Sequence, residues 1–237
     1  MKKRAIVVLS ISFSLIVLVI LSFIIYFSVY YKAVDVDLYL KSSDSVQVRE
    51  VKKGYMFDSI ADDKALIFYP GAKVETKAYA PLCYMLAQEG YDVFLIDMPW
   101  RFALFDINAA DDIIAEYEYE SYYLGGHSLG GAMAANYAAA NYEKLKGLLM
   151  LASYPTKDLT MSDIKALSIY GENDGVLNRK KIEEGRKYLP KSNWEYMILG
   201  GNHAQFASYG KQKKDNDPTI SMLDQIKDTI NLVKKHF

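Results

Sequence analysis

The residues best suited to chemistry lie in a glycine-rich turn, residues 126–130, whose sequence is GHSLG. A short apolar run from Tyr122 precedes this G-x-S-x-G pattern, and the alanine-rich stretch 132–140 follows it. A serine at the tip of a tight strand-to-helix turn has a strained backbone, and only glycine fits two positions before and after it. The helix that follows would also direct free N–H groups toward an approaching oxygen. The spacing therefore predicts that Ser128 is a nucleophile.

Glycine-rich turns between a strand and a helix also bind phosphate groups, which is the main alternative for this segment. A Walker loop requires a lysine after its last glycine, and no lysine follows Gly130 or Gly131. The dinucleotide pattern G-x-G-x-x-G does not occur in the turn either. The position between an apolar run and an alanine-rich helix therefore favours a nucleophile over a phosphate site.

A serine hydroxyl is a weak nucleophile and needs an adjacent base, which a carboxylate in turn orients. The chain has three histidines. His127 lies inside the turn, where its side chain would point away from the hydroxyl, and His236 lies one residue from the end of an amphipathic helix. His203 instead follows an apolar run, in the glycine-containing loop 200–206. We therefore predict that His203 is the base.

Alternating apolar runs and helical patterns predict the scaffold that positions these residues. Opening strands are expected within residues 46–57, and buried strands at 65–69, 91–96, 122–126, 146–151, 165–170 and 194–199. Helices are expected at 76–89, 108–117, 132–140 and 178–188, and a closing helix after Pro218. This alternation predicts an α/β fold with a mostly parallel sheet and helices on both of its faces.

The turn and the order of these elements resemble the α/β-hydrolase family over roughly residues 65–237. The resemblance is closest to a small branch without a cap domain, related to the dienelactone-hydrolase-like proteins. Enzymes of the dienelactone type usually carry a cysteine nucleophile, whereas this chain has Ser128, so a dienelactone substrate is not implied. In this family the catalytic acid lies between the serine and the histidine in chain order. Asp174, four residues beyond the strand ending at Tyr170, is the predicted acid, and Glu172 is its competitor.

The resemblance also implies an oxyanion hole made of two backbone N–H groups. One donor is the residue after the nucleophile, Leu129. The other comes from the loop after the third strand, where residues 70–72 align with the family's His-Gly-x pattern and proline replaces the histidine. We therefore expect Ala72 to supply the second donor.

Apolar residues in loops at the strand ends are expected to line the substrate pocket. The link between the sixth and seventh strands, about residues 152–164, is too short for the helical cap of a lidded lipase. Without a cap, the pocket should be shallow and suited to short acyl chains. The bulky residues expected to line it are Trp100, Phe102, Phe105 and Phe206.

Composition limits the function classes. Hydrophobic residues make up 51% and charged residues 24% of the 237 residues, which is typical of a globular domain of ordinary size. Without its four N-terminal basic residues, the chain carries 24 basic and 29 acidic residues, a net charge of −5, which disfavours a nucleic-acid partner. The single cysteine, Cys83, excludes an intramolecular disulfide and a cysteine-rich metal site.

The N-terminal segment predicts a membrane anchor. Ala5–Tyr31 is a run of 27 residues without a charge, preceded by Lys2, Lys3 and Arg4. It is longer than the apolar region of a cleaved signal peptide, although secretion after signal cleavage is the alternative. The positive-inside rule then places the following domain outside the cytoplasm. We expect the anchor at residues 1–34, a linker at 35–45 and the catalytic domain at 46–237.

Together these features predict a serine hydrolase that cleaves carboxylic esters of small acyl groups through an acyl-enzyme intermediate. No cofactor and no metal ion are expected. The alternatives on the same three residues are an acyltransferase, an amidase or a thioesterase. A surface protein that keeps the fold only as a binding module is the alternative outside enzymology.

Overall fold

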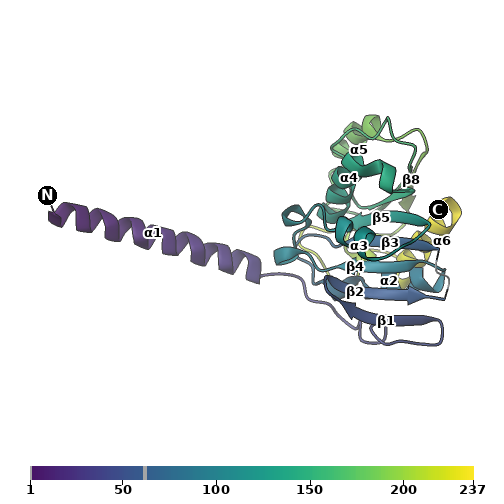
Figure 1. The fold of residues 1–237 in the computed structure, drawn as a ribbon, viewed down its shortest axis with the longest axis horizontal. Coiled ribbons are helices and arrows are strands. Elements are labelled where there is room, and N and C mark those ends of the chain that lie inside the picture. Colours follow the sequence, from purple (N-terminus) through teal and green to yellow (C-terminus); the bar gives the residue numbers. More distant parts are fainter. Residues whose placement is uncertain (1, 61–62) are drawn as a thin grey trace. The chain divides into compact units, whose positions relative to one another are not determined.

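The computed structural model describes residues 2–60 and 63–237, with the backbone alone described for residues 2–9 and 11. The chain divides into two compact units, Met1–Tyr30 and Tyr31–Phe237. The first unit contains helix α1 (Lys2–Ser28), and the second contains every residue that the sequence assigns to chemistry (Figure 1).

Helix α1 covers most of the charge-free run that the sequence predicts to cross a membrane. Among the residues that the structure describes, however, no helix is both long and apolar enough to span a bilayer. The side chains of Lys2, Lys3 and Arg4, predicted to stay in the cytoplasm, lie outside the described residues. The structure therefore does not support the predicted transmembrane helix.

The second unit is built on an eight-stranded sheet with the order β1-β2-β4-β3-β5-β6-β7-β8. Its strands are β1 (Val46–Val51), β2 (Gly54–Ser59), β3 (Lys64–Tyr69), β4 (Asp92–Ile96), β5 (Ser121–His127), β6 (Gly147–Leu151), β7 (Lys165–Gly171) and β8 (Asn193–Ile198). Strands β1 and β2 form an antiparallel hairpin, and β2 pairs antiparallel with β4. All other neighbouring pairs are parallel. The predicted mostly parallel sheet is confirmed.

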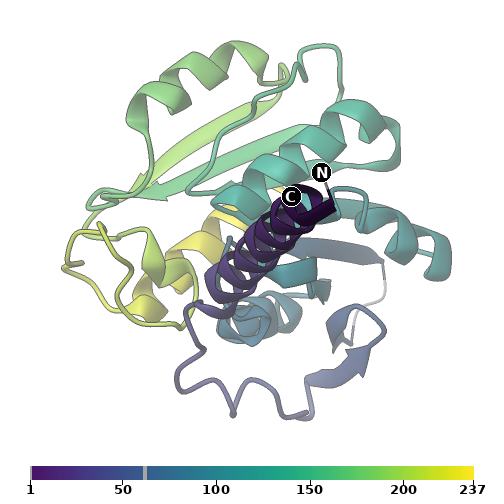
Figure 2. The ribbon, with the colours of Figure 1, turned by 90° about the vertical axis from the view of Figure 1, so that its left-hand side faces the viewer.

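Helices pack on both faces of this sheet, as predicted (Figures 1 and 2). The helices of the second unit are α2 (Ala80–Gln88), α3 (Ala110–Glu116), α4 (Leu129–Asn141), α5 (Arg179–Gly185) and α6 (Met222–His236). Helices α2 and α6 contribute to the core on one face, and α3 and α4 contribute to the core on the other. The parallel strands are thereby buried from both sides, which explains their unbroken apolar sequences.

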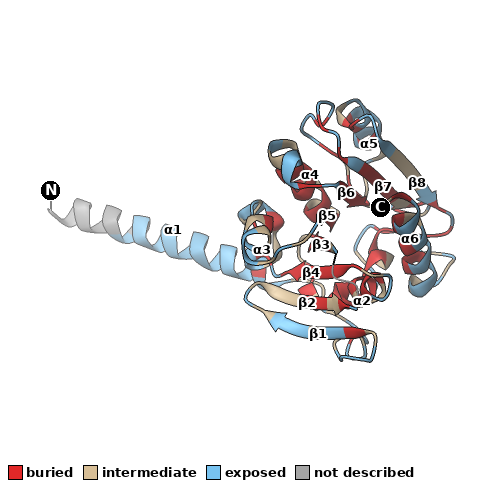
Figure 3. Ribbon diagram, turned by 45° about the vertical axis from the view of Figure 1, so that its right-hand side comes forward, coloured by how far each residue is buried: buried red, intermediate tan, exposed pale blue. Residues whose placement is uncertain are grey.

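Strand β3 shows how one apolar run serves two cores. Leu66 and Phe68 belong to the core beneath α2 and α6, whereas Ile67 and Tyr69 belong to the core beneath α3 and α4. All four side chains are fully buried, and Figure 3 colours the central strands accordingly. Because successive side chains of a strand point to opposite faces, every position of such a strand must be apolar.

The closing helix begins later than the sequence pattern predicts. Helix α6 starts at Met222 rather than at Pro218, because Ser221 caps it. The Ser221 hydroxyl accepts a hydrogen bond from the backbone N–H of Asp224 at 3.1 Å, which a proline side chain could not do. Leu223, in the first turn of this helix, is 37% exposed and does not face the core.

The first residues of the second unit are hydrogen-bonded to two of its loops. Tyr31 donates its backbone N–H to the carbonyl of Lys73 at 2.7 Å. Val34 donates to the carbonyl of Ser208 at 2.9 Å, and the Ser208 hydroxyl donates back to the Val34 carbonyl at 2.6 Å. The structure thus divides the chain after Tyr30, and residues 31–34, which we call the strap, join the loop after β3 to the loop after β8.

Candidate active site

Ser128 occupies a strained turn between β5 and α4. Its backbone angles, φ 53° and ψ −122°, lie where side-chain-bearing residues are rare. Its N–H donates to the carbonyl of Leu151 at 2.8 Å, and its carbonyl accepts from the N–H of Ala132 at 3.1 Å. These two hydrogen bonds hold the turn between the end of β6 and the first turn of α4. The strained turn expected from the sequence is therefore present.

The glycines around Ser128 are required by close backbone contacts. A Cβ atom on Gly126 would lie 2.6 Å from the carbonyl carbon of Gly130. A Cβ atom on Gly130 would lie 2.2 Å from the carbonyl oxygen of Tyr69, at the end of β3. Neither clash can be relieved by a side-chain movement, because both contacts are to backbone. The spacing of the motif therefore reflects how tightly the turn packs on itself and on β3.

The predicted base and acid are joined in the interior. His203 Nδ1 lies 2.8 Å from Asp174 Oδ2, and both side chains are almost completely buried. The other carboxylate oxygen, Oδ1, accepts the backbone N–H groups of Val176 at 2.9 Å and Leu177 at 2.8 Å. With the carboxylate fixed in this way, the proton of a neutral His203 stays on Nδ1. The Nε2 atom then carries the lone pair that a base needs.

The competing residues have other partners. Glu172 accepts the backbone N–H of Gly200 at 2.9 Å and so holds the start of the loop after β8. His236 Nε2 lies 2.9 Å from the Tyr196 hydroxyl, and the His236 ring packs against Trp194 with centroids 4.3 Å apart. Of the two acids considered from the sequence, Asp174 is therefore the one bonded to His203.

Ser128 and His203 line one pocket of about 220 Å³. The complete lining is Ser128, Leu129, Ala132, Ala152, Ser153, Tyr154, Val176, Leu177, Asn178 and His203. His203 Nε2 is buried and has no hydrogen-bond partner within the described chain, so no bond joins it to the Ser128 hydroxyl. Such bonds are often loose in enzymes without substrate and tighten only in the complex.

The four predicted pocket residues do not line this pocket. Phe206 is fully buried at the end of the loop that carries His203, with its ring 5.6 Å from that of His127. Trp100 and Phe105 are 53% and 49% exposed, in two short 3₁₀ turns that follow β4, and Phe102 lies between those turns. The pocket that contains Ser128 instead lies between the start of α4 and the loops after β6 and β7.

The predicted oxyanion donors are favoured by elimination. Leu129 is the first residue of α4, where backbone N–H groups have no partner within the helix, and it lines the pocket. In the turn after β3, Pro70 has no N–H, Gly71 donates to the Tyr79 hydroxyl at 2.9 Å, and Lys73 donates to the Arg101 carbonyl at 3.0 Å. Ala72 supplies the remaining amide of this turn.

Two residues that the sequence analysis missed hold the base loop. Asp215 accepts the N–H of Gly175 at 3.0 Å and of Ala204 at 2.9 Å, and so joins the acid turn to the base loop. Gln225, fully buried on α6, makes two bonds of 2.9 Å to the backbone of Asn202. A polar residue on the inner face of an amphipathic helix was the available signal for Gln225. Asp215 is one of two acids in its loop and gave no such signal.

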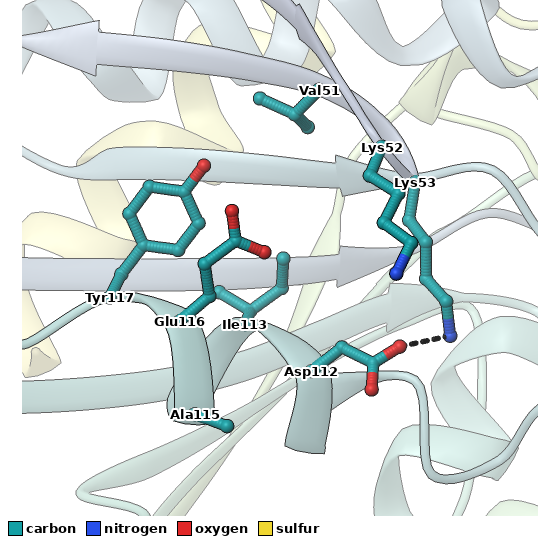
Figure 4. Close-up of a pocket in the computed structure, with 8 residues that line it drawn as sticks. All are labelled: Val51, Lys52, Lys53, Asp112, Ile113, Ala115, Glu116 and Tyr117. Carbon is teal, nitrogen blue, oxygen red and sulfur yellow. Dashed lines mark ion pairs between the residues drawn. The ribbon is translucent and has the colours of Figure 1, made fainter.

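A second pocket, of about 200 Å³, lies between the β1–β2 turn and α3 (Figure 4). It contains none of the predicted catalytic residues. Lys53, at its edge, pairs with Asp106 at 2.8 Å and Asp112 at 2.5 Å, and these bonds raise the pKa of Lys53. The lysine thus stays charged and is unsuited to act as a nucleophile. Within residues 2–60 and 63–237, no cluster of His, Cys, Asp or Glu could hold a metal ion.

Comparisons with known proteins agree with the resemblance drawn from the motif. A model described as "Alpha/beta hydrolase family" matches residues 65–227. A serine hydrolase without a lid from Xanthomonas campestris has a TM-score of 0.51 at 13% identity, over 82% of this chain and 96% of its own. No curated protein matches the chain.

Two further solved structures are similar in fold. A dienelactone hydrolase from Anabaena variabilis has a TM-score of 0.59 at 16% identity, over 81% of this chain and 97% of its own. Carboxyl esterase 2 from the fungus Tuber melanosporum has a TM-score of 0.58 at 14% identity, over 86% of this chain and 89% of its own. The matched region holds the sheet from Ala65 in β3 onward, the strained turn and the Asp174–His203 pair, and the chain belongs to the α/β-hydrolase family.

Proposed function

We propose that this protein is a serine hydrolase that cleaves carboxylic esters of small acyl groups through an acyl-enzyme intermediate. The observation that carries the proposal is the buried 2.8 Å contact between His203 and Asp174, with His203 Nε2 unpaired in the described structure and Ser128 in the same pocket. Membership of the family and the similarity in fold to esterases support hydrolase chemistry in general.

In the proposed reaction, Ser128 Oγ attacks the acyl carbonyl and its proton passes to His203 Nε2. The imidazolium formed is stabilised by the Asp174 carboxylate behind it. When the tetrahedral intermediate collapses, the same proton passes to the leaving alcohol and Ser128 carries the acyl group. Water then repeats the sequence with His203 as base, which releases the acid and restores the serine.

The negative oxygen of each tetrahedral intermediate would be bound by the N–H groups of Leu129 and Ala72. Both are backbone donors in turns that hydrogen bonds already fix, so little reorganisation accompanies the reaction. Loss of one such donor typically costs about 3 kcal/mol of transition-state stabilisation.

The lining of the pocket supports short acyl groups. Its volume is about 220 Å³, and Leu129, Val176 and Leu177 are its larger aliphatic residues. The link between β6 and β7, residues 152–164, forms turns and bends without a helix, and every residue in it is described. Nothing in this link resembles a helical lid, so no activation at an oil surface is expected.

The test is kcat/KM across p-nitrophenyl esters from acetate to palmitate. Each additional methylene buried in a pocket contributes at most about 0.8 kcal/mol. We expect kcat/KM to peak within the first few carbons and to fall at longer chains, where the pocket is full. A steady rise to palmitate would contradict the proposal of small acyl groups.

The location of the domain is a second proposal, and it rests on the sequence. Three basic residues precede a charge-free run of 27 residues, which favours a single membrane anchor with the hydrolase outside the cytoplasm. Protease added to intact cells should then remove the domain, and the purified protein should keep its original N-terminus. A mature chain that starts near residue 30 would indicate a cleaved signal instead.

A further inference from the structure

A tyrosine hydroxyl joins the two segments that flank the proposed oxyanion hole. Tyr79 is fully buried at the end of the 3₁₀ turn Thr76–Tyr79, just before α2. Its hydroxyl accepts the N–H of Gly71 at 2.9 Å and lies 2.7 Å from Nδ1 of His127. Gly71 precedes the expected donor Ala72, and His127 precedes Ser128.

The direction of the second hydrogen bond follows from the state of its two groups. Burial raises the pKa of Tyr79 well above its ordinary value, so the hydroxyl keeps its proton. Burial holds the pKa of His127 well below its ordinary value, so this imidazole is neutral. The hydroxyl has one proton to donate, and of its two partners the Gly71 N–H is itself a donor, so His127 Nδ1 is the acceptor. The bonds therefore run one way, from Gly71 through Tyr79 to His127.

Gly71, the Tyr79 hydroxyl and the His127 ring are tightly packed. A Cβ atom on Gly71 would lie 2.8 Å from the Tyr79 hydroxyl oxygen and 2.9 Å from His127 Nδ1. The Tyr79 ring is held by Phe68 and His127, with centroid distances of 5.3 Å and 5.7 Å. The hydroxyl therefore has a fixed position relative to both the turn after β3 and the turn that carries Ser128.

Glycine accepts a wide range of backbone angles, so residue 71 alone does not fix the direction of the next peptide. We propose that Tyr79 is a positioning residue for the oxyanion hole: its bond to Gly71 sets the direction of the Ala72 N–H relative to the Leu129 N–H. The bond to His127 fixes the hydroxyl to the segment that carries the nucleophile. This inference rests on the proposed hydrolase function, in which those two amides bind the reacting oxygen.

The test compares Tyr79→Phe with the matched variant Tyr123→Phe. Tyr123 is also buried, but its hydroxyl donates to the Phe237 carbonyl at 3.2 Å, away from the pocket residues. Both variants and the full-length protein would be assayed for kcat and KM with p-nitrophenyl acetate, for Ki with a trifluoromethyl ketone, and for melting temperature. The ketone forms an oxyanion when the serine adds to it, so the Ki of the ketone reports how well the oxyanion hole binds that oxygen.

For Tyr79→Phe we expect kcat to fall about 10- to 100-fold and KM to change less than about twofold. The Ki of the ketone should rise by the same factor as kcat/KM falls. Tyr123→Phe should change kcat, KM and the Ki of the ketone by less than about twofold. A Tyr79→Phe variant that keeps kcat within twofold, or loses kcat with an unchanged Ki, would overturn the proposal.

A second pair of variants keeps the test decisive if Tyr79→Phe does not fold. In His127→Gln the amide carbonyl can still accept the Tyr79 proton, whereas in His127→Leu nothing can. We expect the glutamine variant to keep most of the activity that the leucine variant loses. Where both single variants fold, the double variant Tyr79→Phe/His127→Leu can also be assayed. Its fold-decrease in kcat should be smaller than the product of the fold-decreases in the two single variants. Equal activity of the glutamine and leucine variants would overturn the proposal.

Ser128→Ala separates failure of this inference from failure of the proposed function. If only the role of Tyr79 is wrong, the unaltered protein hydrolyses the ester and Ser128→Ala does not. If the proposed function is wrong, Ser128→Ala keeps the activity of the unaltered protein, or neither protein has any.

Discussion

Two regions that the sequence assigns to the active site differ sharply in structure. In the first, the loops after β7 and β8, the side chains of Asp174 and His203 are buried and fixed by hydrogen bonds. The second, the loop after β4, has half-exposed aromatic residues and positive φ angles at Trp100 and Arg101. Both regions follow the carboxyl ends of parallel strands. A position at a strand end therefore brings a residue near the active site. The hydrogen-bond partners of that residue decide whether it forms part of the site.

The sharpest test of the first region concerns the acid. Asp174→Asn should lower kcat about 10³- to 10⁴-fold, because an amide no longer holds the proton of His203 on Nδ1. Glu172→Gln is the matched control and should cost no more than a few-fold, since Glu172 bonds to the Gly200 amide instead. Steady-state kinetics with p-nitrophenyl acetate measure both variants, and the opposite ranking would reassign the acid.

The strap offers a test of stability, since it touches loops on both sides of the site. A domain that starts at residue 35 lacks the bonds from Tyr31 and Val34, and a domain that starts at residue 31 keeps them. At about 0.5–1.5 kcal/mol for each of these three hydrogen bonds, the shorter domain should lose about 1.5–4.5 kcal/mol in its free energy of unfolding. Urea denaturation of the two domains measures the difference. Equal midpoints would show that the strap contributes nothing.

The pocket offers a direct comparison of the two regions. Leu177 lines the pocket, so Leu177→Trp should fill part of its volume of about 220 Å³. We expect kcat/KM for p-nitrophenyl butyrate to fall at least about tenfold more than that for acetate, because one methylene alone discriminates by about 10- to 200-fold. Trp100→Ala removes an exposed ring from the second region and should leave the ratio of the two esters within twofold. A larger effect at Trp100 than at Leu177 would restore the aromatic loop as the pocket wall.

The smallest expected effect is a pH dependence of stability at His127. Its buried imidazole has a lowered pKa, so below about pH 6.5 the unfolded chain binds a proton that the folded chain does not. The free energy of unfolding should therefore fall as the pH falls from about 6.5 toward the lower folded value, by at most about 1.4 kcal/mol per pH unit. His127→Gln should show a shallower slope between pH 6.5 and 5 in urea denaturation. Identical slopes would mean that His127 takes up its proton in the folded state.

These contrasts explain what the sequence could predict. Ser128 could be predicted as the nucleophile because the packing of its turn demands glycines at fixed spacing, which is a local requirement. Asp174 and His203 could be predicted because strand ends are visible as apolar runs that stop at glycine. The bonds from Tyr79 to Gly71, from Asn202 to Gln225 and from Gly175 to Asp215 join residues 8, 23 and 40 positions apart. No local pattern marks such pairs.

The lining of the Ser128 pocket differs from the predicted residues for a related reason. Trp100 and Leu177 both follow strands of the sheet, and Trp100 is the larger side chain. The path of each loop decides which of them faces Ser128, and that path depends on contacts made elsewhere in the fold. The loop after β7 is held in place by the bonds of Asp174 to Val176 and Leu177.

The most direct test of the central claim is covalent labelling of the full-length protein with a fluorophosphonate, followed by peptide mapping. The account predicts one adduct, on Ser128, with no adduct and at least about a thousandfold lower ester hydrolysis in Ser128→Ala. Ser153 lines the same pocket and is the informative alternative. An adduct on Ser153, or undiminished hydrolysis by Ser128→Ala, would contradict the assignment of the nucleophile.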